Sequence, residues 1–336
     1  MTTIKTVAEQ AGVSPATVSR VLSGAAKVDP ERRERVLRAV ADLDYRPNRL
    51  AANLRRQTTQ AIGVVVSDIE NPHFTQMVRA VEDAAFSRGC RVLLCNTDET
   101  ADKQRAYLDM LAGERVQGVI LVPSDPAGAE IGRLLDLGIP LVAFDRVVDD
   151  HRADAVIIDN VEAGRRAADH LIAVGHRRIG LIGGRPGTQT GGERLAGYER
   201  AMAAAGLAPI VADGGFRLDG GHRAAGQLLD TADVSALIVS NNLMAVGALR
   251  AVRERGLTVP TDVAIVSVDD PFWAELVDPP LTALAQPVRR MAESAVRLLF
   301  ERIAGERTSP RCLVFDVELR VRRSCGAGAA RELLAT

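Results

Sequence analysis

The sequence predicts an N-terminal all-α head followed by a larger α/β body with two lobes, each built on a parallel β-sheet. Helical patterns fill the first 46 residues, and from residue 61 short runs of Val, Ile and Leu alternate with helical stretches. The series of apolar runs then starts again near residue 179. Continuous apolar strands that alternate with helices are typical of parallel sheets covered on both faces. The 336 residues are enough for a small head and two lobes of ordinary size.

The first helix is predicted over residues 4–10, with Thr3 as its N-cap. Val7 and Ala11 stand four residues apart and therefore share one face. Gly12 follows, and a glycine adopts a positive φ at low steric cost. The pattern predicts that the chain turns sharply here, as it does between the helices of a helix-turn-helix.

The second helix is predicted to begin at Pro15 behind the N-cap Ser14. Val18 and Val21 point inward, which leaves an outer face of small and polar side chains with Arg20 among them. Small side chains allow close approach to base edges, arginine pairs with guanine through two hydrogen bonds, and a threonine hydroxyl binds phosphate. The candidate DNA-binding residues of this helix are Ser14, Pro15, Ala16, Thr17, Ser19 and Arg20.

Any small helical hairpin shares this apolar pattern, so the pattern alone does not indicate DNA binding. The distribution of charge is a second observation. Residues 1–60 contain 11 Lys and Arg against 6 Asp and Glu, whereas the remainder contains 31 against 37. A basic head on an acidic body is the charge distribution that nucleic-acid binding requires.

A third helix is predicted from Asp29-Pro30-Glu31, which supplies an N-cap, a first-turn proline and a first-turn acid. The segment that follows it, residues 50–56, favours helix but is too short to be stable alone in water. It contains Leu54 and Arg55, an apolar and a basic side chain that suit insertion into a DNA minor groove. We therefore expect this segment to fold on DNA.

The body is predicted to contain strands at residues 62–66, 92–96, 118–123, 141–145, 156–159, 179–184, 236–240 and 263–270, with a further helix at 288–303 and a strand at 312–319. No apolar run approaches the ~20 residues of a membrane span, and the N-terminus lacks the apolar stretch of a secretory signal. The four cysteines form no CxxC pair, so buried reduced thiols are expected, with no metal and no cofactor.

The head resembles the lactose/galactose repressor (LacI/GalR) family of bacterial transcription regulators. The matching residues are Val7-Ala8, Ala11-Gly12-Val13-Ser14, Thr17-Val18-Ser19-Arg20-Val21-Leu22, Tyr45-Arg46-Pro47-Asn48 and Leu54, and the similarity continues to about residue 324. The resemblance implies that Pro15, Ala16 and Arg20 read bases and that Leu54 is the hinge leucine that wedges into the operator. Pro15-Ala16 has no hydrogen-bonding side chain, so readout there would be apolar.

The resemblance also implies a body like a periplasmic sugar-binding protein, with an effector cleft between two hinged lobes. The chain is expected to cross between the lobes three times. The predicted parts are a helix-turn-helix head at 1–46, a hinge helix and linker at 47–60, a first lobe at 61–159 and 288–315, a second lobe at 160–287 and 316–326, and a disordered tail at 327–336.

Ligands of open α/β sheets bind beyond the carboxyl ends of the strands, where polar residues of this chain collect. By resemblance, His73 and Phe74 belong to an N-P-x-F stretch, and Arg194 belongs to an R-x-x-G-[FY] signature. Asn241-Asn242 departs from the family's Asn-Asp pair. The predicted effector-binding residues are His73, Phe74, Asp145, Arg146, Thr190, Arg194, Phe216, Asn241 and Asp269; Asp98 and Ser124 also follow strands. Polar pairs beside an aromatic wall favour a sugar.

No catalytic motif is recognisable. The glycine-rich residues 180–192 contain neither G-x-G-x-x-G nor a P-loop, and a tight strand-to-helix turn explains them better. The sequence thus predicts no catalytic residues and a cytoplasmic homodimeric regulator, nucleoid-associated when bound to DNA. Its partners would be a pseudo-palindromic double-stranded operator and a small carbohydrate effector, with no membrane. The alternative is a cytoplasmic sugar-binding or sugar-processing protein with an incidental helical head.

Overall fold

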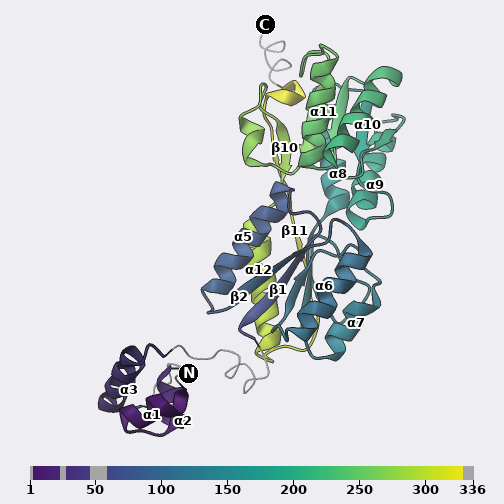
Figure 1. Cartoon of the computed structure of the whole chain (residues 1–336). Helices are drawn as coiled ribbons and strands as arrows, with labels where there is room; N and C mark the ends of the chain where they lie inside the picture. Colours follow the sequence, from purple (N-terminus) through teal and green to yellow (C-terminus); the bar gives the residue numbers. More distant parts are fainter. Residues whose placement is uncertain (1–2, 23–27, 46–58, 328–336) are drawn as a thin grey trace. The chain divides into compact units, whose positions relative to one another are not determined.

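The computed structural model describes residues 3–22, 28–45 and 59–327. The chain divides into two compact units, residues 1–59 and 60–336. The first unit is the head and the second is the α/β body (Figure 1). The predicted Leu54 and Arg55 and the tail beyond residue 327 lie outside the described residues.

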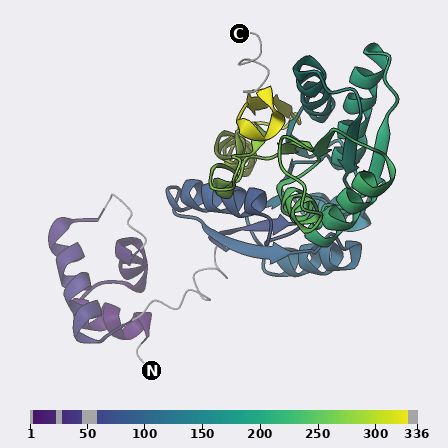
Figure 2. The same cartoon turned by 90° about the horizontal axis from the view of Figure 1, so that it is seen from above.

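The head contains α1 (Ile4–Ala11), α2 (Pro15–Leu22) and α3 (Pro30–Asp42), which form the purple cluster in Figure 2. The predicted local signals are confirmed. The Thr3 hydroxyl accepts the Thr6 N–H, Asp29 accepts the Arg32 N–H, and Gly12 has φ of 64° at the turn. The buried core of the head is Val7, Ala8, Ala11, Val18, Val21, Val36 and Ala39.

The body contains two six-stranded sheets. The first has the order β11-β5-β4-β3-β1-β2 and is parallel throughout; the second has the order β12-β10-β9-β8-β6-β7 and is parallel except for β12. The first consists of β1 (Ala61–Val66), β2 (Arg91–Asn96), β3 (Val119–Leu121), β4 (Leu141–Phe144), β5 (Asp154–Ile158) and β11 (Cys312–Phe315). The second consists of β6 (Ile179–Gly183), β7 (Ile210–Asp213), β8 (Ala236–Val239), β9 (Ala264–Val268), β10 (Thr282–Ala285) and β12 (Glu318–Arg320).

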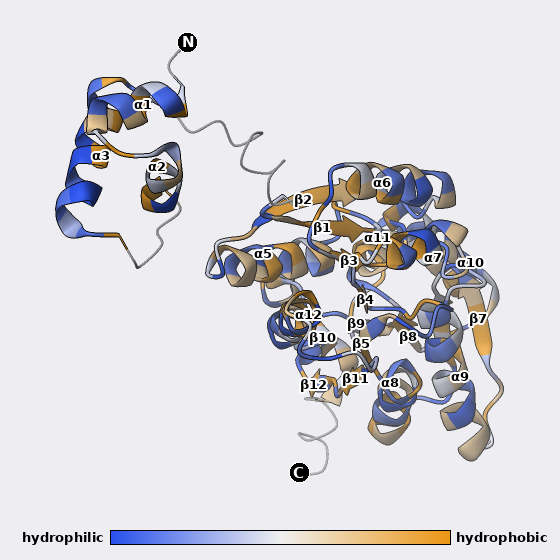
Figure 3. Ribbon diagram, turned by 90° about the horizontal axis from the view of Figure 1, so that it is seen from below, coloured by the Kyte–Doolittle hydropathy of each residue, from blue (hydrophilic) through white to orange (hydrophobic). Residues whose placement is uncertain are grey.

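Helices cover both sheets because the central strands are buried along their whole length and need apolar cover on each face. Strand β1 is orange in Figure 3, whereas helices such as α5 and α6 carry an orange side and a blue side. The helices of the first lobe are α5 (Pro72–Phe86), α6 (Ala101–Gly113), α7 (Ala129–Asp136) and α12 (Val288–Ile303). Those of the second are α8 (Asn160–Val174), α9 (Gln189–Ala204), α10 (Leu218–Thr231) and α11 (Asn242–Glu254), with short 3₁₀ turns at Phe272–Glu275 and Arg323–Cys325.

The chain passes from one sheet to the other three times, after β5, after β10 and between β11 and β12. Helix α12 returns to the first lobe, where it packs on α5 and on strands β3 to β5 (Figure 1). The single strand predicted at 312–319 is therefore wrong: it is two strands, and residues 316–317 connect two different sheets. Among the described residues, no helix is both long and apolar enough to cross a membrane.

Two glycines set the position of α9 in the second lobe. A Cβ on Gly164 of α8 would clash with the carbonyl oxygen of Arg194, and a Cβ on Gly197 of α9 would clash with that of Val161. The two helix backbones therefore touch at these points. This contact places Arg194, in the second turn of α9, against the loop ends of the second sheet.

Candidate functional site

Helix α2 presents the residues predicted to read DNA. Pro15, Ala16 and Arg20 are exposed, and Thr17 and Ser19 are half-buried, while Val18 and Val21 face the core of the head. Ser14 caps the helix, because its hydroxyl accepts the Thr17 N–H at 3.2 Å. One side of this short, capped helix is therefore exposed to solvent, as a recognition helix requires.

The nine predicted effector residues line one pocket in the body. They come from the loops after the carboxyl ends of strands and from the first two turns of helices in both lobes, the placement expected for ligand sites in α/β sheets. Five residues outside the predicted set complete the lining: Asp68, Asn71, Glu99, Arg217 and Gln286. The free volume of the pocket is only about 30 Å³. Such a space holds one or two water molecules, so a larger ligand enters only when the pocket widens.

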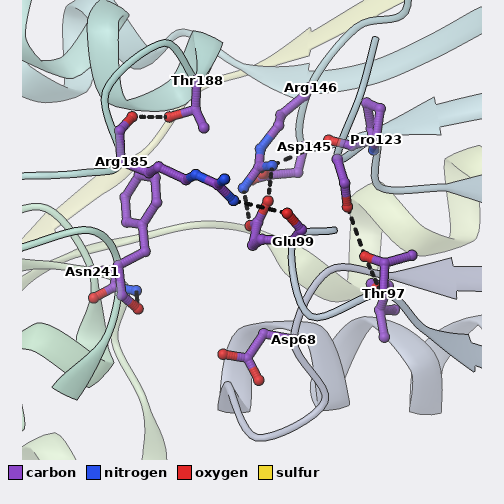
Figure 4. Close-up of polar contacts among 12 residues, drawn as sticks. Asp68, Thr97, Glu99, Pro123, Asp145, Arg146, Arg185, Thr188 and Asn241 are labelled. Atoms are coloured by element: carbon purple, nitrogen blue, oxygen red, sulfur yellow. Dashed lines mark hydrogen bonds and ion pairs between the residues drawn. The ribbon is translucent and has the colours of Figure 1, made fainter. Parts of the chain in front are cut away.

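Arg146 and Glu99 form a buried ion pair in the wall of the pocket. The two Nη atoms of Arg146 donate to the two Glu99 carboxylate oxygens at 2.7 and 2.6 Å, and Nη1 also donates to the Pro123 carbonyl at 3.1 Å. Burial alone would raise the pKa of the Glu99 carboxyl, but the Arg146 guanidinium outweighs it and lowers that pKa below its usual value. Figure 4 shows Arg146 and Arg185 converging on Glu99. The guanidinium edge of Arg146 is thus already occupied, which leaves Nε for a ligand.

His73 lies between two carboxylates. Its Nε2 is 3.8 Å from Asp145 Oδ1, and its Nδ1 is 3.6 Å from Asp269 Oδ1, distances too long for hydrogen bonds. Arg146 Nε is likewise 3.5 Å from Asp145 Oδ2. Within the described part of the chain, His73 Nε2 and Arg146 Nε are buried without a hydrogen-bond partner. The pocket therefore contains the buried Asp145 carboxylate and two nitrogens, His73 Nε2 and Arg146 Nε, that lack hydrogen-bond partners among the described residues.

Arg194 is anchored by neighbours in its own lobe. Its Nε donates to Asn160 Oδ1 at 2.9 Å, and Nη1 donates to the Ser240 carbonyl at 2.5 Å. A guanidinium has five N–H donors, so these anchors fix its direction and leave others for a ligand. Thr190 lies one turn earlier in the same helix and is buried.

Phe216 and Asn241 form another wall. The Phe216 ring lies against Gly184, where a Cβ would clash with it. Asn241 caps α11, because its Oδ1 accepts the Met244 N–H at 2.8 Å, and its Nδ2 donates to the Phe216 carbonyl at 3.1 Å. The side chain of Asn241 thus holds the loop that carries the aromatic ring.

Arginines of the second lobe reach across to the first. Arg217 Nη1 lies 3.2 Å from Asp68 Oδ2, and Arg185 Nη1 donates to the Glu99 carbonyl at 2.8 Å. Burial raises the pKa of the Asp68 carboxyl, although a hydrogen bond from the Glu70 N–H and the charge of Arg217 partly oppose that rise. These contacts hold the two lobes together over the pocket.

Two of the strand-end residues are not brought to the lining. Asp98 pairs with Lys103 at the exposed rim, and Ser124 contacts the Thr97 hydroxyl at 2.7 Å. Sequence reasoning missed Glu99, Arg217 and Gln286. Glu99 and Arg217 each follow a noticed residue by one position, and Gln286 follows β10, whose sequence Thr-Ala-Leu-Ala carries little strand signal.

The family models match two parts of the chain. Residues 3–48 match "Bacterial regulatory proteins, lacI family", and residues 168–325 match "Periplasmic binding protein-like domain". The chain is 39% identical to the HTH-type transcriptional regulator CelR of Thermobifida fusca (96% of this chain, 98% of that protein). It is 34% identical to the HTH-type transcriptional repressor PurR of Yersinia pestis (99% of both).

Solved structures are similar over the same length. The CelR–cellobiose complex superposes with a TM-score of 0.74 at 37% identity, covering 96% of this chain and all of that one. The Lac repressor dimer bound to operator and the anti-inducer ONPF superposes with a TM-score of 0.85 at 30% identity, covering 96% and 99%.

Proposed function

The chain belongs to the LacI family of bacterial regulatory proteins, and from this we propose that a neutral sugar binds its pocket and controls operator binding. Membership makes it a DNA-binding transcription regulator with a small-molecule effector domain, not an enzyme. The alternative of a sugar-processing protein with an incidental head is therefore wrong.

The observation that carries the sugar proposal is the set of unsatisfied groups around Asp145. A sugar hydroxyl both donates and accepts, so one hydroxyl meets the Asp145 carboxylate while its neighbour meets His73 Nε2 or Arg146 Nε. Phe216 supplies the apolar wall that a sugar ring covers. The CelR relative, whose structure contains cellobiose, supports a carbohydrate as the ligand class. The proposed effector-binding residues are the nine predicted from the sequence.

The proposed control operates through the separation of the lobes. A pocket of about 30 Å³ excludes a sugar ring, so binding requires the contacts of Arg217 and Arg185 across the lobes to break and re-form. A ligand that favours one separation shifts the population of lobe arrangements, and with it the geometry of the linker to the heads. We propose a head at 1–46, a hinge and linker at 47–60, lobes at 61–159 with 288–315 and at 160–287 with 316–326, and a tail at 327–336.

We propose that the regulator acts in the cytoplasm as a homodimer on a pseudo-palindromic operator, with the six α2 residues, Leu54 and Arg55 contacting DNA. The Lac repressor relative is a dimer on its operator. A candidate dimer surface is the edge strand β2, where Leu93 and Leu94 are about two-fifths exposed, with Phe86 exposed nearby in sequence. Exposed apolar side chains on an edge strand favour pairing with another chain.

The effector proposal is tested by a thermal-shift screen of sugars, sugar phosphates and nucleobases, since a ligand that prefers the folded state raises the melting midpoint. Asp145→Ala should weaken binding of the sugar found by about tenfold or more, because hydrogen bonds to a charged group contribute roughly 1.5–3 kcal/mol. Asp109→Asn, which alters an exposed ion pair with Arg133, is the matched control. A nucleobase hit without any sugar hit would contradict the proposed ligand class.

The DNA proposal is tested by operator binding at several salt concentrations. Affinity should fall steeply with salt, and Leu54→Ala should weaken specific binding far more than binding to random duplex. Deletion of residues 1–59 should abolish operator binding and preserve effector binding, because these residues form a separate compact unit. If Leu54→Ala weakens binding to the operator and to random duplex equally, Leu54 does not act as a wedge in the operator.

A further inference from the structure

Asn242 stands where the family pattern has aspartate, and its surroundings explain what the amide does. It is the first residue of α11 and is completely buried. Its Nδ2 donates to Asn71 Oδ1 at 2.8 Å and to Asp269 Oδ2 at 3.0 Å. Since both partners are acceptors, this amide nitrogen must point toward them.

Each of the two contacts connects Asn242 to a different part of the pocket. Asn71 Oδ1 also accepts the His73 N–H at 2.9 Å, so it caps α5 in the first lobe. Asp269 follows β9 in the second lobe, and its other oxygen, Oδ1, accepts Gln286 Nε2 at 2.7 Å. The carboxylate of Asp269 is therefore held by one amide donor on each oxygen, and Asn242 joins it to the N-terminus of α5.

We propose that Asn242 is a positioning residue, which orients Asp269 toward the effector and ties it to α5 across the lobes. This inference rests on the proposed function, in which Asp269 accepts hydrogen bonds from the effector. A carboxylate has room for about four hydrogen bonds, so two amide donors leave the remaining lone pairs for ligand hydroxyls.

An aspartate at position 242, in place of the neutral asparagine, would make the contact between residues 242 and 269 depend on pH. The charged or titratable groups that face Asp269 are His73 from α5 and, beyond the imidazole, Asp145; Asp270 beside it is paired with Arg320 and Arg322. A carboxylate at position 242 would lie about 3 Å from that of Asp269. Two carboxylates so close hold one proton between them with a raised pKa, because both cannot ionise without strong repulsion.

The experiment compares wild type, Asn242→Asp and Asn242→Ala at pH 5.0 and pH 8.0, first without ligand. In Asn242→Asp the shared proton restores the donor to Asp269 at low pH, though not the second donor to Asn71. The stability gained from the shared proton is lost as pH rises through the raised pKa. We expect its melting midpoint to lie closest to that of wild type at pH 5.0 and the difference to grow by about 5 °C at pH 8.0. Asn242→Ala should be lower by a similar amount at both values.

The second readout is affinity for cellobiose, D-glucose and D-ribose by calorimetry, expressed as the ratio of variant to wild type so that effects of pH common to both proteins cancel. Asn242→Asp should lose roughly tenfold or more at pH 8.0 and less than about threefold at pH 5.0, as expected for a charge-assisted hydrogen bond. A pH-independent ratio, or an Asn242→Ala variant that melts and binds like wild type, overturns the inference. A pH-dependent midpoint without binding of any of the three sugars supports the Asn242–Asp269 link and counts against the proposed effector.

Discussion

Removal of the Glu99 carboxylate is the sharpest test of how the pocket wall is held. Glu99 and Arg146 are 11% and 7% exposed, and two charge-assisted hydrogen bonds of 2.6 and 2.7 Å join them. Glu99→Ala leaves the Arg146 guanidinium buried with only Asp145 and a carbonyl near it. Breaking a buried pair by removing one partner costs about 3–5 kcal/mol, which for a unit of this size lowers the melting midpoint by roughly 10 °C.

Calorimetric melting of the whole chain at pH 7 measures this effect, and Glu99→Gln separates charge from shape, because it keeps one acceptor oxygen. Asp109→Asn is the control: its partner Arg133 lies 3.2 Å away with both side chains more than half exposed, and such a pair contributes about 0–1 kcal/mol. If Glu99→Ala destabilises the body no more than Asp109→Asn does, the ion pair is not what holds this wall.

The same pair makes a prediction for pH. The pKa of Glu99 is lower in the folded protein than in the unfolded chain, so its stabilising effect is present above the unfolded pKa of about 4.3. It is lost as pH falls through the lower, folded value. The stability difference between wild type and Glu99→Gln should therefore narrow below about pH 4. A difference that widens on acidification would refute the assigned direction.

Four further variants, one of them a control, test the local reasoning. Gly197→Ala should destabilise the body by about 1–3 kcal/mol or more, because its methyl group would meet the Val161 carbonyl, whereas Gly192→Ala in the same helix meets open space and should be neutral or stabilising in thermal melts. Asp29→Ala removes the N-cap of α3 and should destabilise the head by about 1 kcal/mol, measured by helical circular dichroism of the isolated head. Arg20→Ala should weaken operator binding by about 1–3 kcal/mol and relax selection at one base pair, measured by competition among single-base operator variants.

The fold was predictable from the sequence wherever local patterns determine structure. In the head, Gly12 and the caps Thr3 and Asp29 act within four residues of chain, and each has the predicted role. In the body, the long runs of apolar residues were sufficient to predict the central strands. The predictions failed where context decides: β10 is a strand because β9 and β12 flank it, not because Thr-Ala-Leu-Ala favours one. Residues 312–319 likewise form two strands, because the first half pairs with β5 in one sheet and the second half pairs with β10 in the other. The local sequence does not indicate this change of partner.

The pocket was predictable in outline because parallel strands bring their carboxyl ends to one edge of each sheet. What the sequence did not reveal is which groups neutralise one another. Arg146 was predicted to contact the effector, yet Glu99 occupies its Nη atoms. Asp269 was also predicted to contact the effector, yet Asn242 and Gln286 already donate to it. These three pairings join residues that are 47, 27 and 17 positions apart in the sequence, and only the assembled sheets bring them together.

Backbone strain identifies the same pocket without reference to side-chain chemistry. Among the described residues, eight that are not glycine have positive φ, and four of them line the pocket: Glu99, Asp145, Phe216 and Asp269. Phe216, with φ of 63°, is the least suited to the left-handed region, because its bulky side chain cannot form the local hydrogen bonds that help Asn and Asp adopt it. Each such residue costs energy that the surrounding fold must offset, and strain of this kind clusters where a side chain has to be aimed. The strand ends therefore bend so that carboxylates and an aromatic ring meet in one small volume, which a packing requirement alone does not explain.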